Sequence, residues 1–209
     1  MVSPGRNERR KAETRAKIIR AAQELFGEKG YAATSMEDIS TEAEVAIRTI
    51  YLHFESKAAV LLAFFDDWMD EFVRLVGERT ADERLDQAVD RALRTMKDAG
   101  WNDDARIEDV QALHPVPEFV GSGSPEVAGH ILQRWVAAQE TLTERFRATL
   151  GLPADSLLPQ LEATAVFASW FGSVFDFRAR FARQIPGDSS HDVGRVAIRA
   201  YVEGLANQS

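Results

Sequence analysis

The chain has 209 residues, a formal net charge of -8, 45% hydrophobic residues and no cysteine. This length suits one or two domains with a sizeable apolar core. The lack of cysteine excludes disulfides, thiolate zinc sites, iron–sulfur clusters and thiol nucleophiles. The sequence has no run of the roughly 18 apolar residues that a membrane span needs, and its start is polar rather than signal-like. We therefore expect a cytoplasmic protein without a membrane partner.

The charge is distributed unevenly along the chain. Residues 1–57 carry 10 basic and 9 acidic side chains, whereas the remaining residues carry 15 and 24. The first 20 residues alone carry seven basic groups against two acidic ones. The acidity therefore belongs to the later part of the chain, so it does not argue against a polyanionic partner for the first part.

Apolar residues recur at helical spacing almost everywhere, and no alternating run typical of a strand is present, which predicts an all-α fold. Gly30 is expected to end the first helix. The patterns Thr34-x-x-Glu37 and Thr80-x-x-Glu83 are expected to cap two later helices. The expected helices run from about Glu8 to Glu28, Ser35 to Ala43, Ile47 to Phe54, Ser56 to Arg79, Thr80 to Ala99, Asn102 to Pro115, then, after a loop over Pro115 to Ser124, from Pro125 to Leu150, Ser156 to Arg183 and Ser190 to Ala206.

The segment from Thr34 to Phe54 has the anatomy of a helix-turn-helix: a short second helix follows a turn of about three residues. The residues expected to face inward are Ile39, Val45, Ile50 and Phe54, and those expected to face outward are Arg48, Thr49, Tyr51 and His53. An outward arginine and hydroxyl groups on a short helix suit a DNA groove. Helix spacing alone is equally compatible with a three-helix cap whose outer face is solvated.

Two stretches carry a family resemblance: residues 15–39, RAKIIRAAQELFGEKGYAATSMEDI, and residues 45–57, VAIRTIYLHFESK. Together they resemble the DNA-binding domain of TetR-family transcriptional regulators, over roughly Arg15 to Leu62. The resemblance implies an all-helical homodimer that binds a palindromic operator in duplex DNA and usually represses transcription until a small molecule binds. It also implies a DNA-binding domain over residues 1–57, and a ligand-binding and dimerisation domain over residues 58–209.

The resemblance assigns DNA contacts position by position. Ile47, Arg48 and Leu52 fall where the family faces base edges, and Arg48 is suited to bidentate pairing with guanine, worth roughly 1 to 3 kcal/mol of discrimination. The positions that contact phosphates in the family are held here by Ser35, Thr49, Tyr51, His53 and Lys57. The basic segment from Arg6 to Lys17 is expected to be a disordered arm that reaches an adjacent backbone or minor groove; the alternative is a merely solubilising segment.

The turn departs from the family at one position. Glu44 stands where the family usually has glycine, at a place where a left-handed backbone is easiest for a residue without Cβ. A glutamate that keeps this conformation is expected to cost about 1 kcal/mol. Glu42 and Glu44 also place negative charge near the DNA side. Either the turn differs slightly from the family's, or the affinity for DNA is modest and sensitive to salt.

The later part of the chain is rich in aromatic residues, with 15 of the 19 after residue 57. Most of them are expected to form core, but large rings between helices also suit a pocket for a small hydrophobic or aromatic effector. The candidate ligand-binding residues are Trp68, Phe72, Met96, Trp135, Gln139 and Phe171. The resemblance places the homodimer interface on the last two helices, with apolar surface expected from Ala163, Val166, Phe167, Val174, Val193, Ile198, Tyr201 and Leu205.

Other functions find less support. The acidic run from Asp103 to Asp109 has a faint similarity to the metal–diphosphate motifs of all-α synthases, but it stands alone, so we expect no enzyme. The histidines, His53, His114, His130 and His191, lack ligand spacing, so we expect no metal and no cofactor. A metal-dependent effector bound by His114 or His130 remains open. A dimeric small-molecule binder that no longer engages DNA, suggested by Glu42 and Glu44, is the main alternative.

Overall fold

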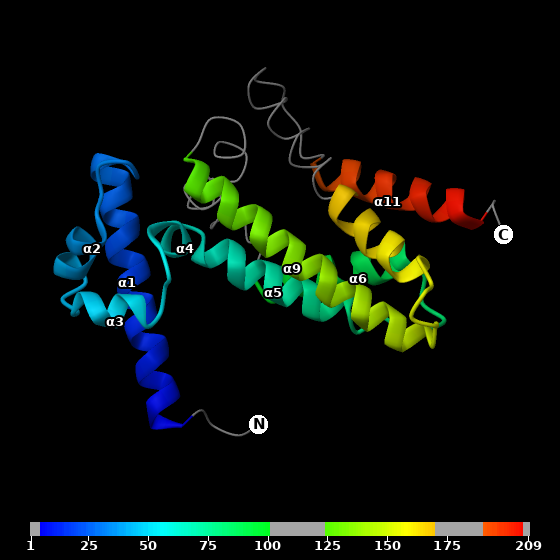
Figure 1. Ribbon diagram of the computed structural model, residues 1–209, viewed down its shortest axis with the longest axis horizontal. Helices are drawn as coiled ribbons and strands as arrows, with labels where there is room; N and C mark the ends of the chain where they lie inside the picture. The colour runs from blue at the N-terminus through cyan, green and yellow to red at the C-terminus, as the bar shows by residue number, and fades with distance from the viewer. Residues whose placement is uncertain (1–4, 101–123, 170–189, 207–209) are drawn as a thin grey trace, which may run out of the picture. The chain divides into compact units, whose positions relative to one another are not determined.

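The computed structural model describes residues 5–100, 124–169 and 190–206, and the elements within these ranges are helices joined by turns (Figure 1). The helices are α1 (Arg6–Lys29), α2 (Met36–Glu42), α3 (Ile47–Tyr51), α4 (Lys57–Leu61), α5 (Ala63–Val76), α6 (Leu85–Asp98), α9 (Pro125–Leu150) and α11 (Ser190–Ala206). Residues 158–169 are also helical. The predicted all-α class is therefore confirmed over the described ranges. The helix expected after Asn102 and the expected loop up to residue 123 lie outside them.

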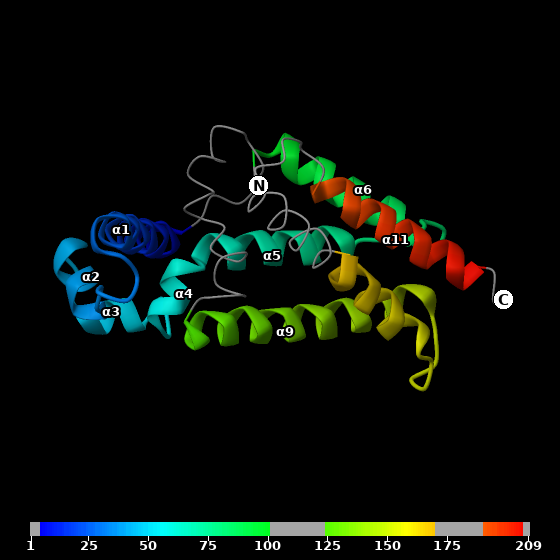
Figure 2. The ribbon, with the colours of Figure 1, turned by 90° about the horizontal axis from the view of Figure 1, so that it is seen from above.

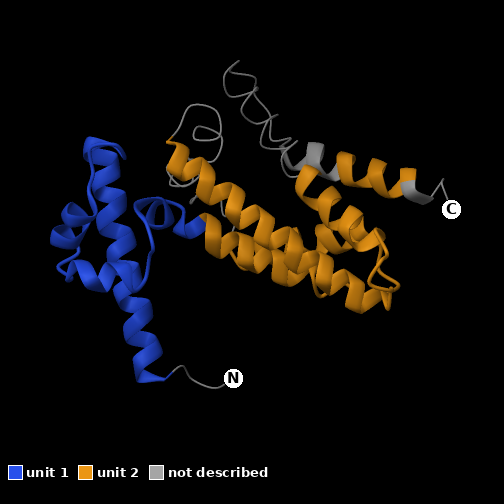
Figure 3. Ribbon diagram, in the orientation of Figure 1, with its two compact units in different colours: residues 1–64 blue, residues 65–209 orange. Residues whose placement is uncertain are grey.

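The chain divides into two compact units, residues 1–64 and residues 65–209 (Figure 3). The boundary predicted after Lys57 falls inside the first unit, because α4 packs into the same core as α1, α2 and α3. Ile18, Ile39 and Ile50, one from each of the first three helices, are completely buried. Ala59 and Val60 of α4 belong to the same cluster. The first unit is therefore a helix-turn-helix closed by α4.

The first helix ends as predicted, but the cap of the second helix lies one residue later than predicted, at Ser35 instead of Thr34. Gly30 ends α1 with a φ of 82°, which a residue without Cβ adopts readily. The Ser35 hydroxyl accepts from the Asp38 amide at 3.0 Å, and the Asp38 carboxylate accepts from the Ser35 amide at 2.8 Å. The Thr34 hydroxyl instead donates to the Gly30 carbonyl at 2.9 Å. The expected Thr34–Glu37 capping box is therefore wrong, because the Thr34 hydroxyl bonds back to the end of α1 instead of to α2.

Two further predictions about helix ends are wrong. The helix expected from Ser56 to Arg79 is interrupted at Leu62, which separates α4 from α5. The helix expected from Thr80 begins only at Leu85, after turns over residues 80–83. Arg84 is its cap, and the Arg84 amide donates to the side chain of Gln87 at 3.2 Å. The bounds predicted for α9 and α11 agree with the structure.

The second unit contains two helix pairs that the figures show side by side: α5 with α9, and α6 with α11 (Figure 2). The second unit also contains a buried ion pair. Arg79 donates to Glu162 at 2.8 Å, and both side chains are about nine-tenths buried. Burial, together with the charge of Glu162, raises the pKa of Tyr201 on α11. Among the described residues, no helix is both long and apolar enough to cross a bilayer.

Candidate nucleic-acid interface

The turn between α2 and α3 is closed by backbone hydrogen bonds and one hydroxyl. The Val45 amide donates to the Ser40 carbonyl at 3.1 Å, and the Ser40 hydroxyl donates back to the Val45 carbonyl at 2.6 Å. The Glu44 amide donates to the Thr41 carbonyl at 3.2 Å. Because both ends of the turn are bonded to one another, the orientation of α3 relative to α2 is fixed before any partner binds.

Glu44 keeps the left-handed conformation in this turn. Its φ is 51°, and among the described residues it alone of the non-glycine residues has a positive φ. A side chain with a Cβ is strained in this region of backbone space. The Glu44 carboxylate lies 4.0 Å from the Lys17 ammonium, with both side chains largely exposed. Such a pair contributes little to stability, so it does not relieve the strain.

Helix α3 is anchored on one side and presents large side chains on the other. Ile50 is completely buried, whereas Tyr51 and Leu52 are 55% and 78% exposed. Arg48, the residue predicted to read guanine, is exposed as well. Ile47 differs, because part of its side chain packs against the core of the first unit. Exposed apolar and aromatic groups on a short helix are costly to leave in water, which favours a surface that contacts a partner.

The residues predicted to contact phosphates have different environments. Ser35 is exposed at the start of α2, while Thr49 and His53 are partly buried. The Lys57 ammonium donates to the carbonyls of Tyr31 and Thr34, both at 2.7 Å. It also lies 4.2 Å from the centroid of the Tyr31 ring. Lys57 therefore ties the start of α4 to the α1–α2 connection, a structural role that sequence spacing did not indicate; its phosphate contact stays a prediction.

The basic segment from Arg6 to Lys17 is helical, so the prediction of a disordered arm is wrong. It forms the beginning of the 24-residue helix α1. The Gly5 amide donates to the Glu8 carboxylate at 3.0 Å, and Arg9 pairs with Glu13 one turn later at 3.7 Å. Such local contacts favour a helix that is already nucleated elsewhere. The nucleus here is the buried half of α1, which starts at Ile18.

The predicted ligand-binding residues belong to the second unit, where the structure brings some of them together. Trp68 and Phe72 are buried and stacked, with ring centroids 5.1 Å apart. Met96 is completely buried on α6. Trp135 and Gln139 both face the helix over residues 158–169: Trp135 lies 6.0 Å from the Phe167 ring, and Gln139 donates to Thr164 at 2.9 Å. Phe171 lies outside the described residues. Their role in ligand binding stays a prediction.

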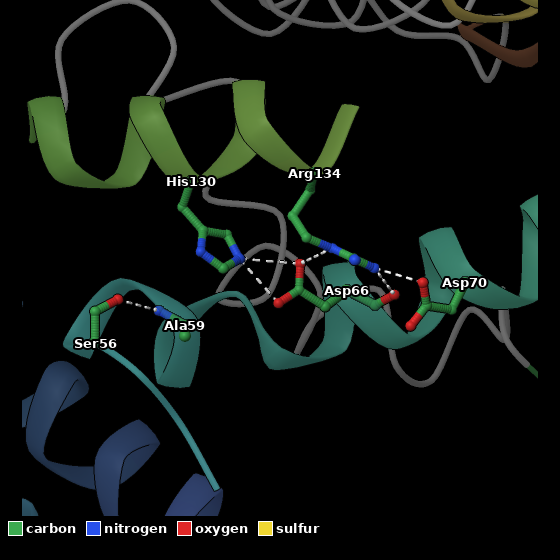
Figure 4. A network of polar contacts seen from close by, with 6 residues as sticks. All are labelled: Ser56, Ala59, Asp66, Asp70, His130 and Arg134. Atoms are coloured by element: carbon green, nitrogen blue, oxygen red, sulfur yellow. Dashed lines mark hydrogen bonds and ion pairs between the residues drawn. The ribbon is translucent and has the colours of Figure 1, made fainter. Parts of the chain in front are cut away.

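A polar network that the sequence did not indicate joins α5 to α9 (Figure 4). The Asp66 carboxylate lies 2.9 and 3.0 Å from Nε2 of the buried His130 and accepts from Arg134 Nε at 3.0 Å. Arg134 also donates to Asp70 at 2.5 Å. The described residues contain no group of three or more acidic, histidine or cysteine side chains placed to hold a metal ion. His130 is paired with Asp66 across the two helices.

Of the expected dimer residues whose side chains the structure describes, most are covered within the chain itself. Ala163, Val166, Phe167 and Ile198 are at most 2% exposed. Tyr201 is partly exposed, and the side chains of the other predicted members lie outside the described residues. Four large apolar side chains are exposed on the helix over residues 158–169, on the turn before it and on α11. They are Leu157, Leu158, Leu161 and Val196, which are 68%, 37%, 43% and 67% exposed. Helical periodicity identified the apolar positions but not which of them the chain covers itself.

Comparisons with known proteins agree on one family. The family model described as "Bacterial regulatory proteins, tetR family" matches residues 18–64. The transcriptional regulator TcmR of Streptomyces glaucescens is 31% identical over 165 residues, which cover 78% of this chain and 72% of TcmR. The transcriptional repressor DhaR of Mycobacterium sp. (strain GP1) is 26% identical over 93% of this chain and 97% of DhaR. A solved complex of SmeT with triclosan shares the fold, with a TM-score of 0.56, 19% identity and coverage of 92% and 91%.

Proposed function

Because this chain belongs to the TetR family of DNA-binding transcriptional regulators, we propose that it is a repressor that leaves a palindromic operator when a small hydrophobic or aromatic molecule binds its C-terminal helices. The similarity to DhaR, a named repressor, supports repression rather than activation. The relatives are named as regulators of transcription, and an enzymatic role is not proposed.

The surface of α3 carries this proposal. The helix is held by a bonded turn and by the buried Ile50, and it exposes Arg48, Tyr51 and Leu52 in solvent. A guanidinium has the two parallel donors that guanine O6 and N7 accept in the major groove. A phenol suits a phosphate oxygen, and an exposed leucine suits a thymine methyl group. This combination fits a duplex groove better than it fits solvent or a purely apolar partner.

A homodimer supplies the symmetry that a palindrome requires. Leu157, Leu161 and Val196 leave apolar surface exposed near the end of the chain. A palindromic operator requires two recognition helices about 34 Å apart, one turn of duplex, and a second copy that covers this surface through a twofold axis supplies the second helix. Sedimentation is expected to show a dimer at micromolar concentration. Leu161→Glu is expected to produce monomers that bind DNA weakly, because each monomer then binds only one half-site.

The effector site is proposed among the helices of the second unit. The stacked rings of Trp68 and Phe72 and the pair of Trp135 with Phe167 offer aromatic surface, and Gln139 adds a polar group. The complex of SmeT with triclosan supports a small molecule as the class of effector for this fold. Quenching of tryptophan fluorescence by triclosan, tested alongside release of bound DNA, measures whether this chain binds the same probe.

The decisive test of DNA binding uses a labelled duplex from the region upstream of this chain's own gene, followed by fluorescence anisotropy at low salt. Arg48→Ala is expected to lower discrimination at one base pair of each half-site by roughly 1 to 3 kcal/mol. Tyr51→Phe keeps the ring and removes only the hydroxyl, so it is expected to weaken binding to all sequences equally. An unaltered chain that binds none of these duplexes refutes the proposed function.

A further inference from the structure

The first two turns of α1 lie outside the core of the first unit. Residues 5–13 are all exposed, and the first buried position of the helix is Ile18. Residues 6–17 contain no apolar side chain larger than that of Ala12 and Ala16. Burial therefore does not explain why this helix extends so far beyond the core. Its local ion pair and terminal hydrogen bond maintain it, and its exposed surface is available for a partner.

The charge of this helical extension favours a polyanion. Residues 6–17 carry six basic and two acidic side chains. At about 100° per residue, Arg6, Arg10 and Lys17 fall within roughly 40° of one another around the helix axis. These three cations form one stripe along an exposed helix. An extension without a large apolar residue lacks the buried face that a membrane surface or a protein groove requires.

The extension starts from the same side of the first unit as the helix-turn-helix. The Arg15 guanidinium lies 5.3 Å from the centroid of the Phe54 ring, just after α3. The Lys17 ammonium lies 4.0 Å from the carboxylate of Glu44, within the turn. From these contacts α1 continues past α3 to its first residue, Arg6 (Figure 1). A duplex bound by α3 is therefore adjacent to the place where the basic extension begins.

We propose that residues 6–17 form a preformed basic helix that binds the phosphates of duplex DNA flanking each half-site. The inference rests on the proposed function, because it requires that α3 binds the duplex. A helix of this length spans about 18 Å, which corresponds to about five base pairs at 3.4 Å each. Because the segment is already helical, binding does not have to order it, in contrast to a disordered arm. The phosphate contacts add affinity and salt dependence without reading sequence.

The experiment compares the full-length chain with Arg6→Gln/Arg10→Gln on a duplex that the unaltered chain protects. Glutamine keeps the helix propensity of arginine, and circular dichroism checks that α1 is retained. Arg94→Gln/Lys97→Gln on α6 is the matched control, because it removes two exposed cations from a helix of the second unit. Affinity is measured between about 50 and 200 mM salt, on the whole duplex and on one trimmed by about five base pairs at each end.

The inference predicts two linked losses. In the Arg6/Arg10 variant the slope of log affinity against log salt falls by about two for each bound copy, and the control variant keeps the full slope. Trimming the flanks of the duplex weakens DNA binding by the unaltered chain but changes DNA binding by the variant much less. Equal slopes for all three proteins, or the same trimming effect on the unaltered chain and the variant, overturn the inference while the proposed function stands. A chain that binds no duplex overturns both.

Discussion

Glu44→Gly tests whether the helix-turn-helix stores backbone strain. The φ of 51° at Glu44 costs a residue with a Cβ roughly 1 to 2 kcal/mol, and glycine removes that penalty. Glycine also gives the unfolded chain more conformational freedom, and this entropy reduces the gain in stability by about 0.4 to 1 kcal/mol. The exposed contact with Lys17 contributes close to nothing. The net expectation is that the first unit becomes more stable by about 1 kcal/mol.

The assay has to resolve the first unit from the second. All four tryptophans belong to the second unit, so tryptophan fluorescence does not report on this change. Native-state hydrogen exchange of the amides of Ile39 and Ile50, both completely buried, measures the opening free energy of the first unit. Protection of these amides is expected to rise by about 1 kcal/mol in Glu44→Gly. The tryptophan fluorescence transition of the second unit in urea is expected to stay unchanged.

Glu44→Ala separates the strain from the charge. Alanine removes the carboxylate but keeps the Cβ, so its stability is expected to stay within about 0.5 kcal/mol of the original. Both variants remove a negative charge beside α3, so both are expected to bind DNA more tightly at low salt. An alanine variant that gains as much stability as the glycine variant refutes the strain argument, because the carboxylate rather than the backbone is then the unfavourable group.

Four other changes test contacts that the structure describes. Glu162→Ala leaves the buried Arg79 without its partner and is expected to cost about 3 kcal/mol in urea unfolding; retention of full stability contradicts the buried pair. Lys57→Met removes two hydrogen bonds to backbone carbonyls and is expected to lower the stability of the first unit by about 1 to 2 kcal/mol, measured by hydrogen exchange. Asp66→Asn is expected to cost about 2 kcal/mol, whereas Asp70→Asn, at a side chain 71% exposed, is expected to change little; equal losses argue against the network. Because Lys29 and Ser35 hold the pKa of Asp38 well below its ordinary value, the stabilisation from its carboxylate is present above pH of about 4 and is lost as the pH falls below it, so Asp38→Asn is expected to flatten the acid limb of a stability profile.

Sequence signals that act through the backbone predicted local structure well. Gly30 ends α1 because glycine adopts a positive φ readily, and Pro125 begins α9 because a first turn needs no amide from it. Both effects are independent of distant residues. The cap of α2 was predicted one residue early because Thr34 and Ser35 have equivalent hydroxyl groups. Only the fold determines that Thr34 is buried and bonds to Gly30.

Contacts between distant segments were beyond sequence reasoning. His130 and Asp66 are 64 positions apart, and no spacing rule pairs them. Lys57 shows the same difficulty, because its partners Tyr31 and Thr34 lie 26 and 23 positions earlier. The resemblance places Lys57 at a position that contacts phosphates when a member of the family is bound to DNA. It carries no information on how the unbound chain already satisfies the ammonium group.

Placement of charge, rather than its sum, decides how the first unit attracts DNA. Residues 1–64 carry 10 basic and 9 acidic side chains, so their net charge alone attracts a polyanion very little. The cations, however, are concentrated on the extension of α1, while Glu44 lies in the turn beside α3. Within a screening length of about 8 Å at physiological salt, phosphates near the extension meet mostly positive charge, and those near the turn meet Glu44. Affinity is therefore expected to depend on how far the duplex extends along α1, which is the quantity that trimming the flanks measures.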